Sequence, residues 1–268
     1  MSAFLETMAR DSRLRADAAA RERPVEAVRE SAHSARPPLA LGSFGESFDL
    51  IAELKPRSPS AGSFPARDPV TAAAGYQSGG AAMLSVLTEP ASFGGSLDDL
   101  RAISAVSSVP VMAKDFLVDT YQVYQARESG ADGILVIARM LSDEAMAELI
   151  DAAEEMGMFA LLEAFDAEDL RRVTTVAMDR GDVLVGVNCR DLDTLEVVPE
   201  RHELLAGRLP AGLVAVAESA MGGPEDVERI VGLGYRAALV GSALMRSADS
   251  STLVRSMVDA GRRMAVTT

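Results

Sequence analysis

Lysine is scarce in this sequence, and its two occurrences are the first residues to consider for chemistry. Lys55 and Lys114 are the only lysines among 26 basic residues, so arginine supplies the other positive charges. An ammonium group can give up its proton, whereas a guanidinium group stays protonated in proteins. We therefore expect Lys55 and Lys114 to lie where a proton is transferred; two lysines left by chance are the alternative.

Carboxylates stand beside these lysines or at the ends of other apolar runs. Glu53 comes two residues before Lys55, and Glu163 and Glu218 each close an apolar run further along the chain. Neighbouring ammonium and carboxylate groups shift each other's pKa, which suits them to general acid–base catalysis. A structural network of ion pairs is the alternative, and such pairing contributes in either case.

The composition argues against other kinds of catalytic centre. His33 and His202 are the only histidines, which disfavours a histidine zinc site or a Ser-His-Asp triad. No glycine-rich dinucleotide or Walker-type motif occurs either. We therefore expect neither a metal nor a cofactor.

The net charge and the single cysteine restrict the partners and the compartment. A formal net charge of −14 disfavours a nucleic-acid or anionic-membrane surface, so an anionic ligand needs a local cationic pocket. No apolar run approaches the roughly 20 residues that span a bilayer. The N-terminus mixes acids and arginines, unlike a signal peptide. One cysteine cannot form an internal disulfide, so we expect the reducing cytoplasm.

Short apolar runs alternate with amphipathic segments along most of the chain. Runs of this kind are typical of strands that are buried on both faces. They cover residues 50–54, 83–87, 110–113, 133–137, 159–162, 183–187, 213–217 and 237–240. Between them, residues 142–156 and 224–233 begin with polar or proline helix-start signals, and Gly130, Gly157 and Gly234 mark helix ends.

Eight such β–α units predict an α/β protein, a (β/α)8 TIM barrel with an N-terminal helical extension. A doubly wound open sheet is the alternative, but it rarely needs eight strands and usually begins with a glycine-rich turn. We predict the extension over residues 1–48, with a helix over Ala3–Arg21 and a turn at Arg36–Pro38. The barrel then covers residues 49–268, and the whole chain 1–268 forms a single domain.

The polar candidates all fall at one end of this predicted barrel. Active sites of TIM barrels lie at the C-terminal ends of the strands, which here carry both lysines. The polar or small residues at these ends are Glu53, Lys55, Lys114, Glu163, Asn188, Arg190, Glu218, Ser219, Gly241 and Ser242. Their convergence favours a functional site over a solvated rim.

Small residues follow the last two predicted strands. Residues 218–223 and 241–243 are rich in glycine, serine and alanine. Loops of this kind present backbone N–H groups to a phosphate at the usual phosphate position of these barrels. Ordinary tight turns are the alternative.

Longer motifs around these residues resemble the indole-3-glycerol phosphate synthase family. Residues 53–60 read E-x-K-x-x-S-P-S, and the K-D-F triplet stands at 114–116. The resemblance continues in order through residues 85–89, 93–97, 117–119, 121–122, 162–163, 188–192, 217–219 and 239–242. It spans about residues 50–246, with a looser likeness in the N-terminal helix. Related phosphosugar barrels lack the combination of E-x-K and K-D-F.

The resemblance implies a carboxy-lyase of tryptophan biosynthesis. In that reaction an anthranilate-bearing deoxyribulose phosphate closes its ring, loses CO2 and then loses water to give indole-3-glycerol phosphate. By resemblance Lys114 is the general acid that protonates the ketone oxygen, and Glu163 stabilises the cationic intermediate or acts as a base. Glu53 and Lys55 form a pair beside the ring, with Lys55 an acid or an anion binder. Which of these four groups serves the dehydration stays open.

The resemblance also implies the residues that bind the substrate. Asn188 and Arg190 hold polar groups of the substrate, and Glu218 and Ser219 match the remaining rim residues of the family. Ser58, Gly241 and Ser242 match its phosphate binders. The anthranilate ring is walled by Pro59, Phe93, Phe116, Leu135 and Leu195. We expect a phosphorylated small molecule as the partner, no nucleic acid or membrane, and a monomer, with a weak homodimer as the alternative.

Two positions depart from the family pattern. Ala220 stands where the family has glycine after E-S, and alanine costs about 1 kcal/mol if the backbone there has a positive φ. Cys189 replaces a small polar residue, and its side chain can point away from the site. Two other functions stay open: a diverged, non-catalytic phosphosugar-binding barrel, and a related enzyme of a specialised indole pathway.

Overall fold

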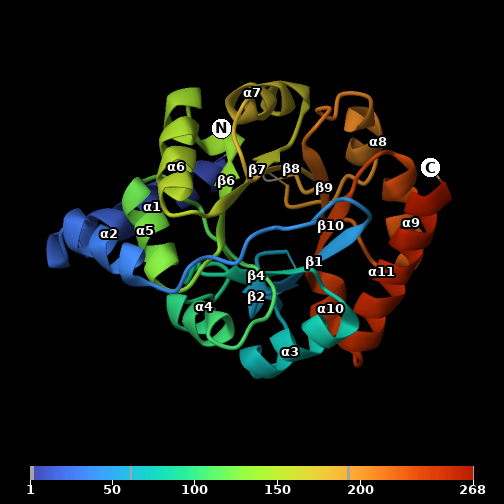
Figure 1. Ribbon diagram of the computed structural model, residues 1–268, viewed down its shortest axis with the longest axis horizontal. Coiled ribbons are helices and arrows are strands. Elements are labelled where there is room, and N and C mark those ends of the chain that lie inside the picture. Colours follow the sequence, from blue (N-terminus) through green and yellow to red (C-terminus); the bar gives the residue numbers. More distant parts are fainter. Residues whose placement is uncertain (1–2, 61, 192–193, 268) are drawn as a thin grey trace.

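The computed structural model describes residues 3–60, 62–191 and 194–267 of the chain and shows a closed barrel of parallel strands (Figure 1). The barrel closes because β1 pairs with both β10 and β4. Its strands are β1 (Asp49–Leu54), β4 (Met83–Leu87), β5 (Val111–Lys114), β6 (Gly133–Ile137), β7 (Phe159–Ala164), β8 (Val183–Asn188), β9 (Val214–Glu218) and β10 (Ala237–Val240). The predicted TIM barrel is therefore confirmed, with each strand within two residues of its expected bounds.

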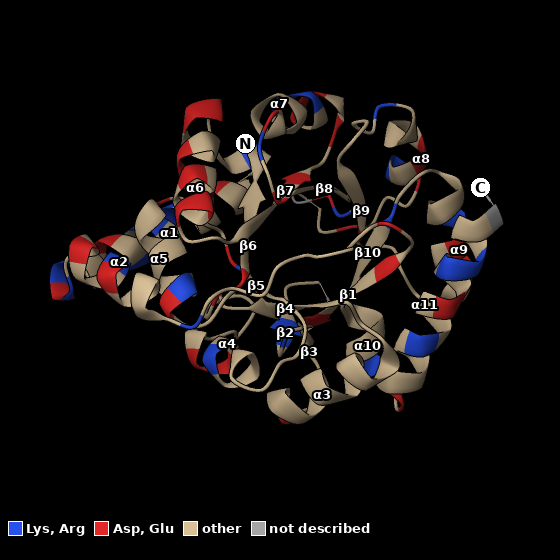
Figure 2. Ribbon diagram, in the orientation of Figure 1, with Lys and Arg blue, Asp and Glu red and all other residues tan. Residues whose placement is uncertain are grey.

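Helices surround the strands and follow one another around the barrel in chain order (Figure 1). They are α3 (Pro69–Gly79), α4 (Leu97–Ser104), α5 (Thr120–Glu128), α6 (Asp143–Glu155), α7 (Ala167–Ala177), α8 (Arg201–Ala206), α9 (Pro224–Gly232), α10 (Ser242–Arg246) and α11 (Ser250–Thr267). The predicted helix starts hold, since the Ser142 hydroxyl accepts from the Ala145 N–H and Pro224 opens α9. Charged residues of both signs are spread over these outer helices (Figure 2). None of the helices in the described ranges has the length and apolar character to cross a membrane.

The N-terminal extension contains two helices rather than the single one predicted. The expected helix is α1 (Ala3–Glu22), and α2 (Val25–Ser34) follows it and packs on α5. The sequence interpretation missed α2, a ten-residue helix that buries only Val28 and Ala32, one turn apart. The extension lies beside α5, on the opposite side of the barrel from α11 (Figure 1).

Two small elements near the barrel mouth were also not predicted. The ribbon of β2 (Arg57–Ser58) and β3 (Gly62–Ser63) forms antiparallel pairs directly after β1. The single-turn helix η1 (Ala138–Met140) follows β6. Both are too short to leave a periodic pattern, yet both shape loops that follow strands on the side of the active site.

Strand alternation divides the core into an inner and an outer part. On β1, Leu50 and Ala52 belong to the apolar layer between strands and helices, whereas Ile51 belongs to the barrel interior. The interior core also takes in Leu5 and Met8 of α1, so the extension covers part of the barrel interior. Successive side chains of a strand point to opposite faces, so Ile51 sets which later residues point inward.

Candidate active site

The same alternation turns the candidate catalytic side chains inward. On β5 the interior residue is Met112, and on β7 it is Leu161. Two residues further on, Lys114 and Glu163 therefore face the barrel axis. Each of these residues lies inside its strand, so the ladder of backbone hydrogen bonds holds it in place. Glu218 on β9 and Asn188 on β8 likewise end their strands and pair in register.

These side chains surround a cavity of about 520 Å³ at the C-terminal end of the barrel. Every candidate site residue named from the sequence lines this cavity except Glu218. Glu218, at the C-terminal end of β9, is fully buried and lies against Lys114, which lines the cavity.

Glu53 lies between the two lysines of the chain. Its Oε1 accepts from Lys55 Nζ at 2.5 Å, and its Oε2 lies 3.1 Å from Lys114 Nζ. Burial raises the pKa of Glu53, but the positive charges of Lys114 and Lys55 outweigh that effect and lower it to about 2. Glu53 is thus a carboxylate at any ordinary pH.

Lys114 is held by acids on two other strands. Its ammonium lies 3.1 Å from Glu53 Oε2 and 3.2 Å from Glu218 Oε2. Burial lowers the pKa of Lys114, but the negative charges of Glu53, Glu218 and Glu163 outweigh burial and raise it. Lys114 therefore carries its proton in the unliganded site. We call Glu53, Lys55, Lys114, Glu163 and Glu218 the charged cluster.

Glu163 is positioned by an amide. Asn188 Nδ2 donates to Glu163 Oε2 at 3.1 Å, while Asn188 Oδ1 accepts from Ser219 Oγ and the Arg190 N–H, both at 2.9 Å. Two donors on Oδ1 oblige the amide to turn its NH2 group toward Glu163. Burial and the negative charge of Glu218 raise the pKa of Glu163 well above the usual range.

Arg190 links the loop after β8 to the ribbon over the mouth. Its guanidinium donates to Ser60 Oγ at 2.9 Å and to the Leu195 carbonyl at 2.8 Å. Arg201 then donates to the carbonyls of Asn188 and Arg190, at 2.7 and 3.2 Å. The path of this loop is therefore fixed by two arginines. Leu192 of the family-like motif lies outside the described residues.

Aromatic rings form the apolar wall of the cavity. The ring centroids of Phe93 and Phe116 lie 5.9 Å apart, and those of Phe4 and Phe116 lie 6.0 Å apart in an edge-to-face arrangement. Pro59, Leu135 and Leu195, the other residues that the resemblance implies for a wall, line the same cavity. Phe4 was not predicted because it belongs to the extension, far from the recognisable motifs.

Small residues occupy the side of the mouth formed by the loops after β9 and β10. We call Ser58, Ser219, Ala220, Gly241 and Ser242 the small-residue corner; all five line the cavity. Ser219 and Ala220 have positive φ values of 65° and 59°. The backbone strain that we expected if φ is positive at Ala220 is therefore present. A Cβ on Gly241 would lie 2.2 Å from Glu53 Oε1, so glycine is required where the corner meets the charged cluster.

Further cavity-lining residues were missed by the sequence interpretation. They are Phe4, Leu87, Asp115, Ile137, Val197, Leu239, Val240 and Arg246, whereas Ala220, Met221, Gly222 and Ala243 belong to the predicted phosphate loops. Leu87 and Ile137 could have been predicted, because each ends its strand an even number of residues after an inward-facing residue. Cys189 behaves as the sequence suggested, since it is buried and its Sγ contacts the Pro199 carbonyl at 3.7 Å.

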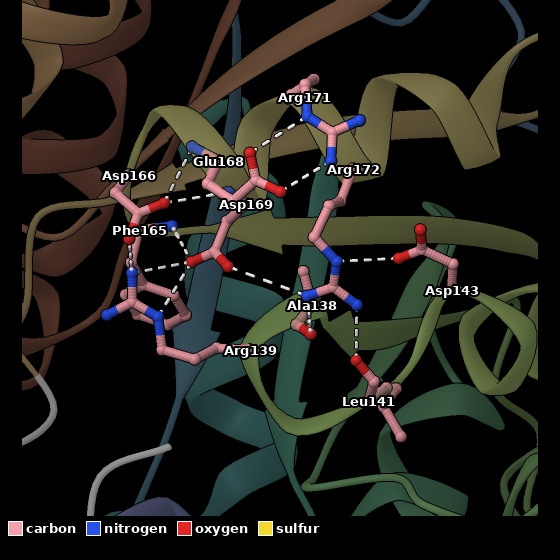
Figure 3. Close-up of polar contacts among 10 residues, drawn as sticks. All are labelled: Ala138, Arg139, Leu141, Asp143, Phe165, Asp166, Glu168, Asp169, Arg171 and Arg172. Atoms are coloured by element: carbon pink, nitrogen blue, oxygen red, sulfur yellow. Dashed lines mark hydrogen bonds and ion pairs between the residues drawn. The ribbon is translucent and has the colours of Figure 1, made fainter.

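A network of arginines and acids fixes the loops after β6 and β7 (Figure 3). Arg139 donates to Asp169 at 2.9 Å, and its guanidinium lies 5.0 Å from the centre of the Phe165 ring. Arg172 donates to Asp143 at 2.7 Å and to the Ala138 carbonyl at 2.9 Å. These contacts tie η1 and α6 to α7 just outside the strand ends that carry Ile137 and Glu163.

The charge and donor chemistry of the site suits proton transfer to an anionic ligand. Two ammonium groups, a buried neutralisable carboxyl and an amide face one cavity that has an apolar wall on one side. In the described ranges, no group of three or more His, Cys, Asp or Glu side chains is arranged to hold a metal ion.

Comparison with known proteins shows the family of the chain. The family model for indole-3-glycerol phosphate synthase matches residues 5–257. The chain is 42% identical over 255 residues to the indole-3-glycerol phosphate synthase of Mycobacterium ulcerans, covering 92% of both proteins. It is 41% identical to indole-3-glycerol phosphate synthase 1 of Streptomyces coelicolor, covering 94% of both.

Solved structures of more distant proteins share the fold alone. 3-Hexulose-6-phosphate synthase from Salmonella typhimurium aligns with 81% of this chain and all of its own, at a TM-score of 0.63 and 15% identity. N-(5'-phosphoribosyl)anthranilate isomerase from Pyrococcus furiosus aligns with 81% of this chain and 99% of its own, at a TM-score of 0.55 and 18% identity. Both likenesses concern the barrel.

Proposed function

The chain belongs to the indole-3-glycerol phosphate synthase family, and from this premise we propose which residues bind the substrate and move its protons. It is a carboxy-lyase of tryptophan biosynthesis that acts on a phosphorylated small molecule. The observation that supports the roles below is the burial of both lysines of the chain against Glu53 inside one cavity.

Lys114 is the general acid of ring closure. The aromatic carbon that bears the carboxylate attacks the ketone carbon, a C–C bond forms, and the C=O electron pair moves to oxygen. Because the pKa of Lys114 is raised, its proton moves only as the oxygen gains negative charge, and the product is a hydroxyl group. Loss of CO2 then returns an electron pair to the cationic ring system.

Glu163 faces the same reacting centre from β7. Its carboxyl is buried and held by Asn188, so it keeps a fixed direction throughout the reaction. A carboxyl with a raised pKa either holds a proton or, once ionised, is a stronger base than an exposed glutamate. It therefore stabilises the cationic intermediate or acts as a base, the two roles that the resemblance implies.

The substrate spans the mouth from the aromatic wall to the small-residue corner. We place the anthranilate ring against Phe93 and Phe116 and the phosphate at Gly241 and Ser242. Lys55 then lies between the phosphate and the ketone, because its Nζ is 2.9 Å from the place where a Cβ on Gly241 would stand. The negative phosphate finds a local positive charge there despite the net charge of −14 of the chain.

A direct assay tests the proposed function. The protein is incubated with the anthranilate-bearing deoxyribulose phosphate, and the indole product is followed by its fluorescence. Turnover is expected with the phosphorylated substrate and a large rise in KM with the dephosphorylated analogue. Binding without turnover would instead indicate the non-catalytic phosphosugar-binding barrel.

The domain organisation and the assembly state extend the proposal. We propose that residues 1–268 act as one domain, because α1 contributes Leu5 and Met8 to the interior core of the barrel. We also propose a cytoplasmic monomer, with a weak homodimer as the alternative. Sedimentation at several protein concentrations distinguishes the two assembly states.

A further inference from the structure

Gly186 lies between the strands that carry two acids of the charged cluster. In the barrel, Glu163 of β7 pairs with Gly186 of β8, and Asn188 of β8 pairs with Glu218 of β9. Strand alternation turns position 186 toward the barrel axis, two residues before the inward Asn188. A Cβ on Gly186 would lie 2.1 Å from Glu218 Oε1, so Glu218 fills the space where a side chain would stand.

Glu218 is enclosed with one oxygen satisfied and the other not. Its Oε2 lies 3.2 Å from Lys114 Nζ. Its Oε1 is buried and meets no hydrogen-bond donor among the described residues. A buried, charged oxygen without a hydrogen-bond donor destabilises the folded protein. A proton on a neighbouring group would provide the missing donor.

Glu163 is placed to supply that proton. Its Oε2 already accepts from Asn188, whose own oxygen is occupied by Ser219 and the Arg190 N–H. A proton on Glu163 therefore belongs on Oε1. The Arg190 guanidinium is engaged elsewhere, with Ser60 on the ribbon over the mouth.

The charge balance of the cluster agrees with one extra proton. Ion pairs join Lys55 and Lys114 to Glu53 and Lys114 to Glu218, whereas none within the described residues reaches the third carboxyl of the cluster, that of Glu163. All three are buried, and an unbalanced buried negative charge is strongly disfavoured. Glu53 keeps its charge, since its pKa falls to about 2 under the two lysines. The proton therefore resides on the other two acids.

The direction of the pKa shift at Glu163 supports this balance. Burial, the negative charge of Glu218 and the closeness of its carboxyl raise the pKa of Glu163. The positive charge of Lys114 and the hydrogen bond from Asn188 lower it, and the raising effects prevail. Two carboxyls this close titrate as a pair rather than singly.

We propose that Glu163 and Glu218 hold a single proton between them across the space left by Gly186, which makes Gly186 a positioning residue for the pair. This inference deepens the proposed function, because it specifies the protonation state in which Glu163 meets the substrate. A methyl group at position 186 would displace Glu218 Oε1 and separate two carboxyls that both remain in the chain.

The proton is measured directly on the free protein. Glutamate side chains are labelled with carbon-13, the signals of the two acids are assigned with Glu163→Gln and Glu218→Gln, and both are titrated by NMR. We expect two coupled steps in the unsubstituted protein. Gly186→Ala and Glu218→Gln should each move the titration of Glu163 to lower pH, because each removes the neighbouring negative oxygen.

A matched glycine controls for the added methyl group. Gly181 precedes β8, and a Cβ there would meet nothing within 4 Å, so Gly181→Ala should leave the titration unchanged. An unshifted Glu163 in Gly186→Ala or in Glu218→Gln overturns the proposal. If Gly186→Ala does not fold, Glu218→Gln alone decides. No substrate is present, so the result does not depend on the proposed reaction.

Activity provides a second readout. In Gly186→Ala, one limb of the pH profile of kcat/KM should move to lower pH, and turnover at the original optimum should fall by up to about 10²-fold through misplacement. A merely structural role would lower Tm and leave the limb in place, which contradicts the proposal. If the unsubstituted protein is inactive, the proposed function is contradicted. The NMR titration still tests the shared proton in that case.

Discussion

The charged cluster and the small-residue corner face the same cavity but are held in different ways. Lys114, Glu163 and Glu218 lie at the C-terminal ends of strands, where backbone ladders hold them, together with the Lys114–Glu218 ion pair and the hydrogen bond from Asn188 to Glu163. Ser219 and Ala220 stand in a loop with left-handed backbone conformations. In our proposal the cluster offers side-chain atoms to the substrate, whereas the corner offers backbone N–H groups to its phosphate.

This difference sets how each region responds to substitution. In the cluster, each acid or ammonium determines the charge state of its neighbours, so one change spreads through the set. At Ala220 of the corner, our proposal depends on the path of the backbone, because alanine and glycine present the same N–H group. Gly241 is the point of contact between the two, because Glu53 lies against it.

Lys114→Arg should have the largest effect, because it keeps the charge of the cluster and removes its acid. Arginine has a pKa above about 12 and is a very poor proton donor near neutral pH. A lost general acid lowers the rate by about 10²- to 10⁴-fold. We expect kcat to fall at least that far, measured by indole fluorescence.

The control for Lys114→Arg is the binding and stability of the same variant. Substrate affinity and Tm should change little, because the guanidinium still faces Glu53 and Glu218. Near-normal turnover would show that Lys114 acts only as a positive charge, and the proposed mechanism would be wrong.

Gly241→Ala should damage both regions at once. The new methyl group would overlap Glu53 Oε1, which holds Lys55, and would displace the backbone of the corner. A displacement of about 1 Å in such a site costs about 10²-fold in rate. We expect kcat/KM to fall by about that factor. Gly232→Ala, where a Cβ meets nothing within 4 Å, is the control; equal activity of both variants would contradict the contact between the regions.

Strand alternation explains why so much of this site is predictable from the sequence. Once β1, β5 and β7 are located, the two-residue alternation of side chains along a strand predicts that Glu53, Lys114 and Glu163 point inward. The depth of Glu218 is not predictable in this way. It depends on the empty space at Gly186 on the adjacent strand, which only the register between strands reveals.

The segments outside the barrel that reach the cavity, α1 and the β2–β3 ribbon, were harder to predict than the barrel strands. Phe4 reaches the cavity because Arg15 binds Asp115 and Arg13 binds Asp119, which fasten α1 across the loop after β5. Such contacts join residues about a hundred positions apart, and local periodicity carries no trace of them. The β2–β3 ribbon consists of only two residue pairs, too few to leave a hydrophobic pattern.

Lys55→Arg tests whether Lys55 belongs with the cluster or with the corner. If its main role is ionic, arginine preserves the charge beside Glu53 and kcat falls much less than in Lys114→Arg. The larger guanidinium crowds Gly241, so we expect KM to rise by about tenfold, or about 1.4 kcal/mol. Steady-state kinetics give both constants. A loss in kcat equal to that of Lys114→Arg would assign Lys55 a proton-transfer role instead.

Ala220→Gly should have the smallest effect, and it tests the claim that the corner works through its backbone. Ala220 has a φ of 59°, where a Cβ is disfavoured, so glycine relieves that strain but also loses more conformational entropy on folding. These effects oppose each other, and we expect the free energy of unfolding to change by about 1 kcal/mol or less. The N–H group is the same in both residues, so kcat should stay within a few-fold. KM and the inhibition constant of inorganic phosphate should stay equal or fall. A gain of several orders of magnitude in turnover would show that alanine impairs the natural protein, and would favour the non-catalytic barrel.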